Sequence, residues 1–197
     1  MTNMKLAVIT GSVREGRFGP TITRWFTEHA RQHGLFDVDV VDLADTPLPL
    51  ELPGTLEQLV DVRGRPGDLR RLAARLEQAD AYVVVTPEYN HSLPASLKHL
   101  IDWHPVQWQA KPVALVSYGG YGGGVRAAEH LRQIFCEMHA VTIRNWISLD
   151  QHWTRFDAEG RLMDPEGPDG AAKAMLDQLG WWSTVLHEAR LATPYRA

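Results

Sequence analysis

The segment from Thr86 to His91 places a proline, a carboxylate, an aromatic ring, an amide and an imidazole directly after the apolar run 81–85. A buried strand that stops at such side chains, before a helix that begins near Pro94, is typical of a loop that faces a ligand rather than a core. We therefore expect this loop to line a binding site.

A second loop, residues 11–19, joins a short apolar strand to an amphipathic helix. Gly19 is expected to cap the helix, and Pro20 suits the first helical position because its missing amide hydrogen would be unpaired there. The free amides of a first helical turn bind anions. The side chains that add donors and charge are Ser12, Thr21, Arg14 and Arg17. The loop therefore predicts a site for a phosphate monoester.

The glycine spacing of this loop excludes two common nucleotide motifs. No Gly-Lys-Ser/Thr follows, as a P-loop requires, and Gly11, Gly16 and Gly19 lie too far apart for G-x-G-x-x-G. Taken alone, the loop is equally well explained as a solvated basic turn in which the glycines serve only the backbone.

A third loop, residues 117–124, contains five glycines within six residues. Glycines leave room for a flat ring or another backbone to come close, although a flexible turn also explains them. In a parallel sheet, ligands bind at the carboxyl ends of the strands, where the strand order reverses. If the three loops meet there, they favour a mononucleotide with its phosphate at the first loop and its ring against the other two.

The elements that must position these loops alternate along the chain. Strands are expected at 5–10, 37–41, 81–86, 112–117 and 140–143, and helices at 20–33, 68–78, 94–103, 124–138 and 169–191. Five strand–helix units imply an α/β fold with a parallel sheet covered on both faces. The stretch 45–67 is expected to be a surface excursion with a helical turn near 56–60, and 146–170 a second turn-rich segment.

Composition narrows the class of protein. A chain of 197 residues with 44% hydrophobic residues is long enough for one sizeable core, so a single domain over residues 1–197 is expected. The net charge of -4 lacks the basic excess that attracts nucleic acid or anionic membranes, and neither is expected as a partner. No apolar stretch approaches the roughly 20 residues that span a bilayer, and no signal-peptide pattern is present, so the cytoplasm is the expected compartment.

Two side-chain groups outside the loops are expected to be structural. The single cysteine, Cys136, lies in a helical pattern with Leu131 and Phe135 and is predicted to be buried and inert. His29 and His33 have the spacing of metal ligands on one helix, but no third ligand accompanies them, and no metal site is predicted.

Three motifs in these loops agree in type, order and spacing with one known family. They are Gly11-Ser12-x-Arg14-x-x-Arg17-x-Gly19-Pro20, then Thr86-Pro87-Glu88-Tyr89-Asn90 with Pro94-Ala95-x-Leu97-Lys98-x-x-x-Asp102-Trp103, and the glycine loop before Arg126-Ala127. Over residues 5 to 138 the chain resembles the NADPH-dependent FMN reductases, which include quinone, azo-dye and chromate reductases. The resemblance implies a flavodoxin-like doubly wound five-stranded parallel sheet, noncovalent FMN, and a homodimer or homotetramer with the flavin near a subunit boundary.

The resemblance also implies the site residues. It puts the FMN phosphate on Ser12, Arg14, Arg17, Gly19, Pro20, Thr21 and Ile22, the last three mainly through backbone amides. It puts the edge of the isoalloxazine against Pro87, Glu88, Tyr89 and Asn90, with Ser117, Gly119 and Gly120 completing the site. Glu88 is better explained as fixing its loop than as touching the ring. Position 99 is histidine here, whereas the family usually has asparagine after the lysine. We expect this difference to affect local packing or a subunit contact more than flavin binding.

The activity implied is that of an FMN-dependent NAD(P)H oxidoreductase that reduces quinones or similar small acceptors, such as free flavin, azo dyes or chromate. FMN carries the chemistry, so no catalytic side chain is expected, and NADPH and NADH both remain open as hydride donors. Candidates to line the second-substrate pocket are Tyr89, His91, Trp108, Tyr118 and Tyr121. The alternatives are a flavodoxin-type electron carrier, a class that tends to be more acidic, and a non-catalytic flavin-binding regulatory module.

Overall fold

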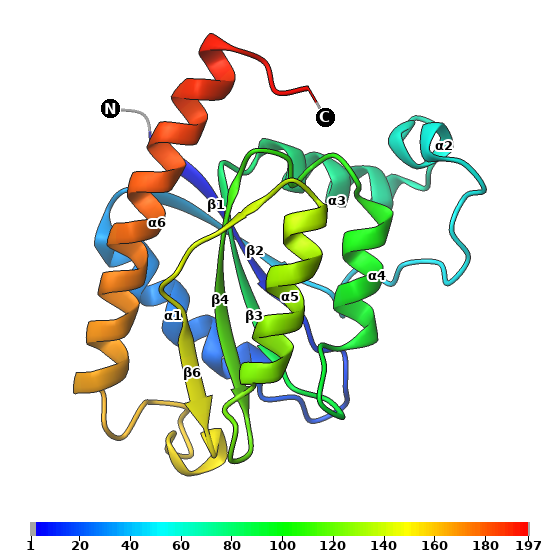
Figure 1. Ribbon diagram of the computed structural model, residues 1–197. Helices are drawn as coiled ribbons and strands as arrows, with labels where there is room; N and C mark the ends of the chain where they lie inside the picture. The colour runs from blue at the N-terminus through cyan, green and yellow to red at the C-terminus, as the bar shows by residue number, and fades with distance from the viewer. Residues whose placement is uncertain (1–2, 197) are drawn as a thin grey trace.

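The computed structural model describes residues 3–196 and shows a parallel sheet between two layers of helices (Figure 1). The strands are β1 (Met4–Thr10), β2 (Phe36–Asp42), β3 (Ala81–Pro87), β4 (Pro112–Gly119), β5 (Val141–Thr142) and β6 (Ile147–Asp150). The helices are α1 (Gly19–His33), α2 (Leu56–Val60), α3 (Gly67–Gln78), α4 (Ala95–Trp103), α5 (Val125–Glu137) and α6 (Glu166–Ala192), with a short 3-10 helix at His152–Thr154.

The sheet has the predicted flavodoxin order, β2-β1-β3-β4-β5, with all pairs parallel. The fifth strand position differs from the prediction, because two short strands share it. β5 pairs with the start of β4, and β6 pairs with its end. Between them the chain leaves the sheet at Asn145, whose amide donates to the Gln178 side chain of α6 at 2.8 Å. Buried Ile147 and Leu149 alternate with exposed Ser148, a pattern that is typical of a strand and could have predicted β6.

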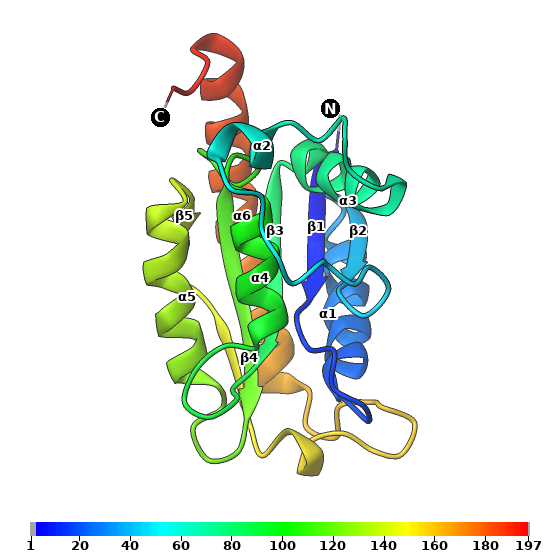
Figure 2. The ribbon, with the colours of Figure 1, turned by 90° about the vertical axis from the view of Figure 1, so that its right-hand side faces the viewer.

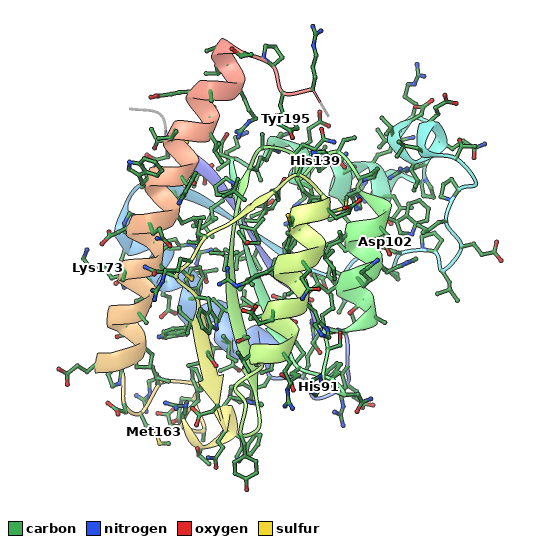
Figure 3. All side chains as sticks on the ribbon, viewed as in Figure 1. His91, Asp102, His139, Met163, Lys173 and Tyr195 are labelled. Atoms are coloured by element: carbon green, nitrogen blue, oxygen red, sulfur yellow. The ribbon has the colours of Figure 1, made fainter. Side chains whose placement is uncertain are left out.

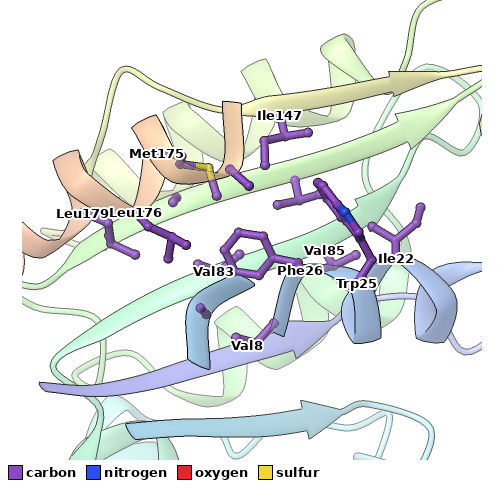
Figure 4. Close-up of a cluster of buried hydrophobic side chains, with 14 of the residues drawn as sticks. Val8, Ile22, Trp25, Phe26, Val83, Val85, Ile147, Met175, Leu176 and Leu179 are labelled. Atoms are coloured by element: carbon purple, nitrogen blue, oxygen red, sulfur yellow. The ribbon is translucent and has the colours of Figure 1, made fainter. Parts of the chain in front are cut away.

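Helices cover both faces of the sheet (Figures 1 and 2). α1 and α6 pack on one face, where Val8, Phe26, Val83 and Met175 lie side by side in the core (Figure 4). α3, α4 and α5 pack on the other face. Every residue of β3 and β4 is buried, which explains why the run 81–85 is apolar without alternation.

α1 begins one residue earlier than predicted. Phe18 is the N-cap, Gly19 is the first helical residue, and Pro20 follows it. Phe18 contributes no side-chain cap; its ring lies instead 4.9 Å from that of His152 and 5.4 Å from that of Phe156, centroid to centroid. The helix ends at Gly34, whose φ of 80° is left-handed and suits glycine.

The prediction that Cys136 is buried is wrong, since its side chain is exposed. The buried side chains of α5 include Leu131 and Phe135. Position 136 follows Phe135 and is rotated by about 100° around the helix axis, which carries it out of the packed face. An apolar neighbourhood in sequence therefore did not imply burial here.

α6 is fastened to the rest of the fold at two points along its length. Its first half packs Met175 and Leu179 into the core, and near its C-terminus His187 Nδ1 lies 2.7 Å from the carboxylate of Asp80. Among residues 3–196, no helix, α6 included, combines the length and apolar character needed to cross a membrane.

His104, the C-cap of α4, predicts an acid-labile step in stability. Its Nδ1 lies 2.8 Å from the carbonyl of Leu100, and burial lowers its pKa to about 4. The unfolded chain therefore binds more protons than the folded one between pH 6.5 and 4, and the free energy of unfolding falls across that range as pH decreases, by up to about 3 kcal/mol below pH 4. We expect His104→Asn, which keeps a donor for Leu100, to lose this part of the pH dependence.

Urea unfolding of parent and variant at pH 7.5 and 4.5 measures this effect, because carboxylates titrate equally in both proteins. If parent and variant showed the same change in unfolding free energy, folding would not lower the pKa of His104.

Candidate functional site

The three loops meet at the carboxyl ends of β1, β3 and β4, the lower edge of the sheet in Figures 1 and 2. We call residues 11–18 loop 1, residues 88–94 loop 2 and residues 120–124 loop 3. The amide of Gly11 donates to the carbonyl of Val85 at 2.9 Å, and the amide of Glu88 donates to the carbonyl of Tyr118 at 3.1 Å. Backbone hydrogen bonds thus join the strand ends that carry all three loops.

Three hydroxyl groups converge beside the start of α1. Ser12 is fully buried, and its Oγ lies 2.6 Å from the hydroxyl of Tyr89. Tyr118, at the end of β4, points its hydroxyl at Gly19, where an added Cβ would lie 3.1 Å from it. Burial, followed by the neighbouring Tyr89, raises the pKa of Tyr118, while hydrogen bonds with the Gly19 backbone and Ser12 act in the opposite direction. We call Ser12, Tyr89 and Tyr118 the hydroxyl cluster.

The two arginines of loop 1 have different surroundings. Arg17 forms an ion pair with Asp42 at the end of β2, with Nη2 2.8 Å from Oδ2, and donates from Nη1 to the carbonyl of Ser12 at 2.7 Å. The hydrogen bond with Asp42 is the main cause that raises the pKa of Arg17. Arg14 is exposed and forms no ion pair with any residue in the range 3–196. The sequence analysis did not identify Asp42 as the partner of Arg17. Its position at the end of a strand, like those of loops 1 and 2, was the available signal.

The backbone amides at the start of α1 are less free than predicted. The amides of Thr21 and Ile22 point to the carbonyl of Phe18, at 3.1 and 3.4 Å, and Pro20 has no amide hydrogen. Gly19 lies beside the hydroxyl of Tyr118, which would be 3.1 Å from an added Cβ. Of the helix-start residues that the resemblance implied, Gly19 is therefore the one brought to the cluster.

Loop 2 is a two-residue hairpin. Tyr89 and Ser92 exchange backbone hydrogen bonds of 2.9 and 3.1 Å, and the two residues between them, Asn90 and His91, have φ values of 49° and 75°. Two consecutive left-handed residues form the tight turn that matches strand twist. Asn90 and His91 are exposed, and Figure 3 shows His91 at the end of the molecule opposite His139 and Tyr195. The turn fixes the direction in which loop 2 presents its polar groups.

Glu88 braces loop 2 against α5. Its carboxylate accepts the backbone amide of Arg126 at 3.1 Å and forms an ion pair with the Arg126 guanidinium. Only 8% of the Glu88 side chain is exposed. A carboxylate near a helix N-terminus is stabilised by the helix dipole, so these contacts support the interpretation that Glu88 fixes the loop.

Loop 3 is held from inside by serine hydroxyls. Ser117 and Ser148 both donate to the carbonyl of Gly123, at 2.9 and 3.0 Å, and Ser117 is fully buried. An added Cβ on Gly119 would lie 3.2 Å from the amide nitrogen of Gly124. Ser117 and Gly119 therefore shape the loop, while exposed Gly120 leaves an open surface.

One predicted residue of the second-substrate pocket, Trp108, does not line a pocket. The prediction is wrong because Trp108 is fully buried against Tyr82 and Phe135, with ring centroids 4.6 and 5.3 Å away. The residue that sequence reasoning missed is Trp153, which is 57% exposed and is the nearest neighbour of an added Cβ on Gly120, at 3.9 Å. The pairing of β6 with the end of β4 carries it there.

His99, the departure from the family pattern, belongs to local packing. Its Nε2 lies 2.6 Å from the carbonyl of Pro49, and Trp103 Nε1 donates to the same carbonyl at 3.1 Å. It thereby fastens the excursion 45–67 to α4, beside a cavity of about 310 Å³ that Val13 and Ser96 also line.

The polar groups at the three loops fit a phosphorylated flavin. The hydroxyl cluster and the guanidinium of Arg14 are donors suited to a phosphate, and the two nearby carboxylates, Asp42 and Glu88, are each neutralised by an arginine. Gly120 and the loop 2 turn leave an open, polar surface for a ring. Residues 3–196 hold no group of three or more His, Cys, Asp or Glu side chains arranged for a metal ion.

Comparisons with known proteins show the family and the fold. The sequence model of the family described as NADPH-dependent FMN reductase matches residues 4–154. An NAD(P)H-dependent FMN reductase of Schizosaccharomyces pombe is 40% identical over 126 residues, which span 64% of this chain and 62% of the relative. An NADPH:quinone oxidoreductase of Arabidopsis thaliana is 31% identical over 172 residues, 82% of this chain and 83% of the relative. The structure of the flavoenzyme NAD(P)H:(acceptor) oxidoreductase FerB from Paracoccus denitrificans superposes with a TM-score of 0.73 at 24% identity, covering 92% of this chain and 98% of that one.

Proposed function

Because the chain belongs to the NADPH-dependent FMN reductase family, we propose that it binds FMN at loops 1 to 3 and passes reducing equivalents from NAD(P)H to a quinone or another small acceptor. The family is one of NAD(P)H-dependent oxidoreductases that use FMN, as the sequence predicted. The observation that carries the site is the convergence of the hydroxyl cluster, with Ser12 2.6 Å from Tyr89, at the carboxyl ends of the strands.

In this proposal the side chains bind and orient while the cofactor reacts. FMN, when bound, supplies the hydride chemistry. Ser12, Arg14 and Gly19 hold the phosphate. Pro20, Thr21 and Ile22 form the first turn of α1 beside it, with the amides of Thr21 and Ile22 directed at the Phe18 carbonyl. Arg17 does not contact the phosphate directly. Its ion pair with Asp42 and its hydrogen bond to the Ser12 carbonyl fix loop 1. No side chain is required to act as an acid or base in the hydride transfer.

The other two loops position the ring. Pro87 and Tyr89 hold loop 2 at the end of β3, and Asn90 presents its polar groups from the tight turn. Ser117 keeps loop 3 closed, so that Gly119 and Gly120 let a ring approach the backbone. Glu88 locks the relative position of loops 2 and 3 through Arg126.

Anaerobic mixing with nicotinamide tests the activity. We expect FMN-loaded protein to lose the yellow absorbance of oxidised flavin when NADPH or NADH is added without a partner enzyme. A quinone added afterwards should restore the colour. A flavodoxin-type carrier or a regulatory module would stay yellow with both nicotinamides, and that result would reject the enzyme proposal.

The remaining proposals concern the setting of this activity. We propose that residues 1–197 form a single FMN-binding domain, supported by the one continuous sheet in residues 3–196. A homodimer or homotetramer in the cytoplasm is proposed from the family resemblance. Exposed Trp181, 60% accessible on α6, offers one apolar surface for a subunit contact. Quinones, free flavin, azo dyes and chromate are all acceptors that the proposal allows.

A further inference from the structure

Tyr118 is a buried hydroxyl group to which the family resemblance gives no role in binding FMN. It was a candidate for the second-substrate pocket, yet only 3% of it is exposed, and its ring packs edge-on against His152 with centroids 5.0 Å apart. Its hydroxyl instead reaches away from loop 3, across the sheet edge, to Gly19 at the start of α1. A residue at the end of β4 thus extends into the part of the site that loop 1 forms.

We propose that Tyr118 is a phosphate ligand that makes the site selective for FMN over riboflavin. The inference rests on the proposed function, because it takes FMN as the occupant of loops 1 to 3. Tyr118 is not part of the loop 1 motif. The selectivity that it provides comes from the junction between β4 and loop 3.

The chemistry of the hydroxyl suits a phosphate. Burial and the neighbouring Tyr89 hydroxyl raise the pKa of Tyr118, so the group keeps its proton at neutral pH and can donate it to a phosphate oxygen. A neutral donor inside the fold adds no buried charge that would need a partner in the absence of ligand. The exposed guanidinium of Arg14 supplies the charge, and the buried hydroxyls supply directed hydrogen bonds.

The surroundings of Tyr118 hold the hydroxyl in place before any ligand arrives. The ring belongs to the core on the α1 and α6 face, and His152, which packs against it, also contacts the ring of Phe18 with centroids 4.9 Å apart. The His152 Nδ1 lies 3.2 Å from the carbonyl of Gly119 and ties this packing to β4. A donor fixed in this way loses little conformational entropy on binding.

The test removes the hydroxyl and compares two flavins that differ only in the phosphate. Apo-protein of the parent and of Tyr118→Phe is titrated with FMN and with riboflavin, and binding is followed by quenching of flavin fluorescence. A hydrogen bond to a charged group contributes roughly 1.5–3 kcal/mol, so we expect the Kd for FMN to rise about tenfold to hundredfold. The Kd for riboflavin should stay within about twofold, since riboflavin offers this hydroxyl no anion.

The control is Tyr195→Phe, which removes a tyrosine hydroxyl at the far end of the molecule, where it lies 2.9 Å from His139 Nδ1 (Figure 3). This variant should bind both flavins as the parent does. Equal weakening of FMN and riboflavin in Tyr118→Phe would overturn the inference and make the residue merely structural, and unchanged FMN binding would overturn it as well. A parent that binds neither flavin would reject the proposed function itself.

Discussion

Replacing Gly124 with alanine is expected to lower the free energy of unfolding by about 2–6 kcal/mol and to abolish flavin binding at ordinary concentrations. Gly124 has a φ of 80°, and an added Cβ would lie 2.8 Å from the amide nitrogen and 2.9 Å from the carbonyl oxygen of Tyr118. These are backbone atoms of a central strand, which cannot move aside. Relief must therefore come from loop 3 itself, which would open where Ser117 and Gly123 now close it.

Gly16→Ala is the matched control for this prediction. Gly16 in loop 1 also has a left-handed φ, 65°, but no atom lies within 4 Å of an added Cβ. The substitution should cost about 1 kcal/mol from backbone strain alone. Urea unfolding of the two variants separates strain from steric overlap. Similar losses in both would mean that loop 3 adapts to a side chain and that its glycines serve only the turn.

The sequence predicted the sheet and its order because the signals for them are local. The apolar run 81–85 and the alternation of strands with amphipathic helices depend on neighbouring residues, and the structure reproduces both. The failures involve contacts between distant segments. β6 is short and depends on pairing with the end of β4. The burial of Trp108 depends on Tyr82 in β3 and Phe135 in α5, which are distant in sequence.

The candidate site shows the same division. The sequence identified the three loops, and the structure brings them together through Ser12, Tyr89 and Tyr118. It did not reveal which polar groups are already engaged by other residues. Asp42 lies 25 residues from Arg17 and neutralises it. For Glu88 the sequence favoured a role in fixing its loop, but it did not reveal the partner, Arg126. Residue type alone cannot distinguish a charge that faces a ligand from a charge that is paired within the fold.

Replacing Arg17 with alanine is expected to lower the free energy of unfolding by about 2–4 kcal/mol and to weaken FMN and riboflavin binding together. Both partners of the Arg17–Asp42 pair have only 18% of their side chains exposed, so the substitution leaves an unpaired carboxylate with little access to water. It also releases the Ser12 carbonyl, which Arg17 holds at 2.7 Å. The loss is therefore one of loop geometry, which both flavins require.

The double variant Arg17→Ala/Asp42→Asn isolates the unpaired charge. Asparagine keeps the oxygen that accepts the Ala44 amide at 3.0 Å. Removing the charge should therefore restore most of the stability, while loop 1 still lacks the contacts of Arg17.

Arg14→Ala is the contrasting variant. Loss of this exposed side chain should change stability by less than about 0.5 kcal/mol, yet it should weaken FMN binding about tenfold or more relative to riboflavin binding. Thermal or urea unfolding and flavin titration measure both quantities. If Arg17→Ala weakened only FMN and left stability unchanged, Arg17 would bind phosphate directly, and its pair with Asp42 would have to open when the cofactor binds.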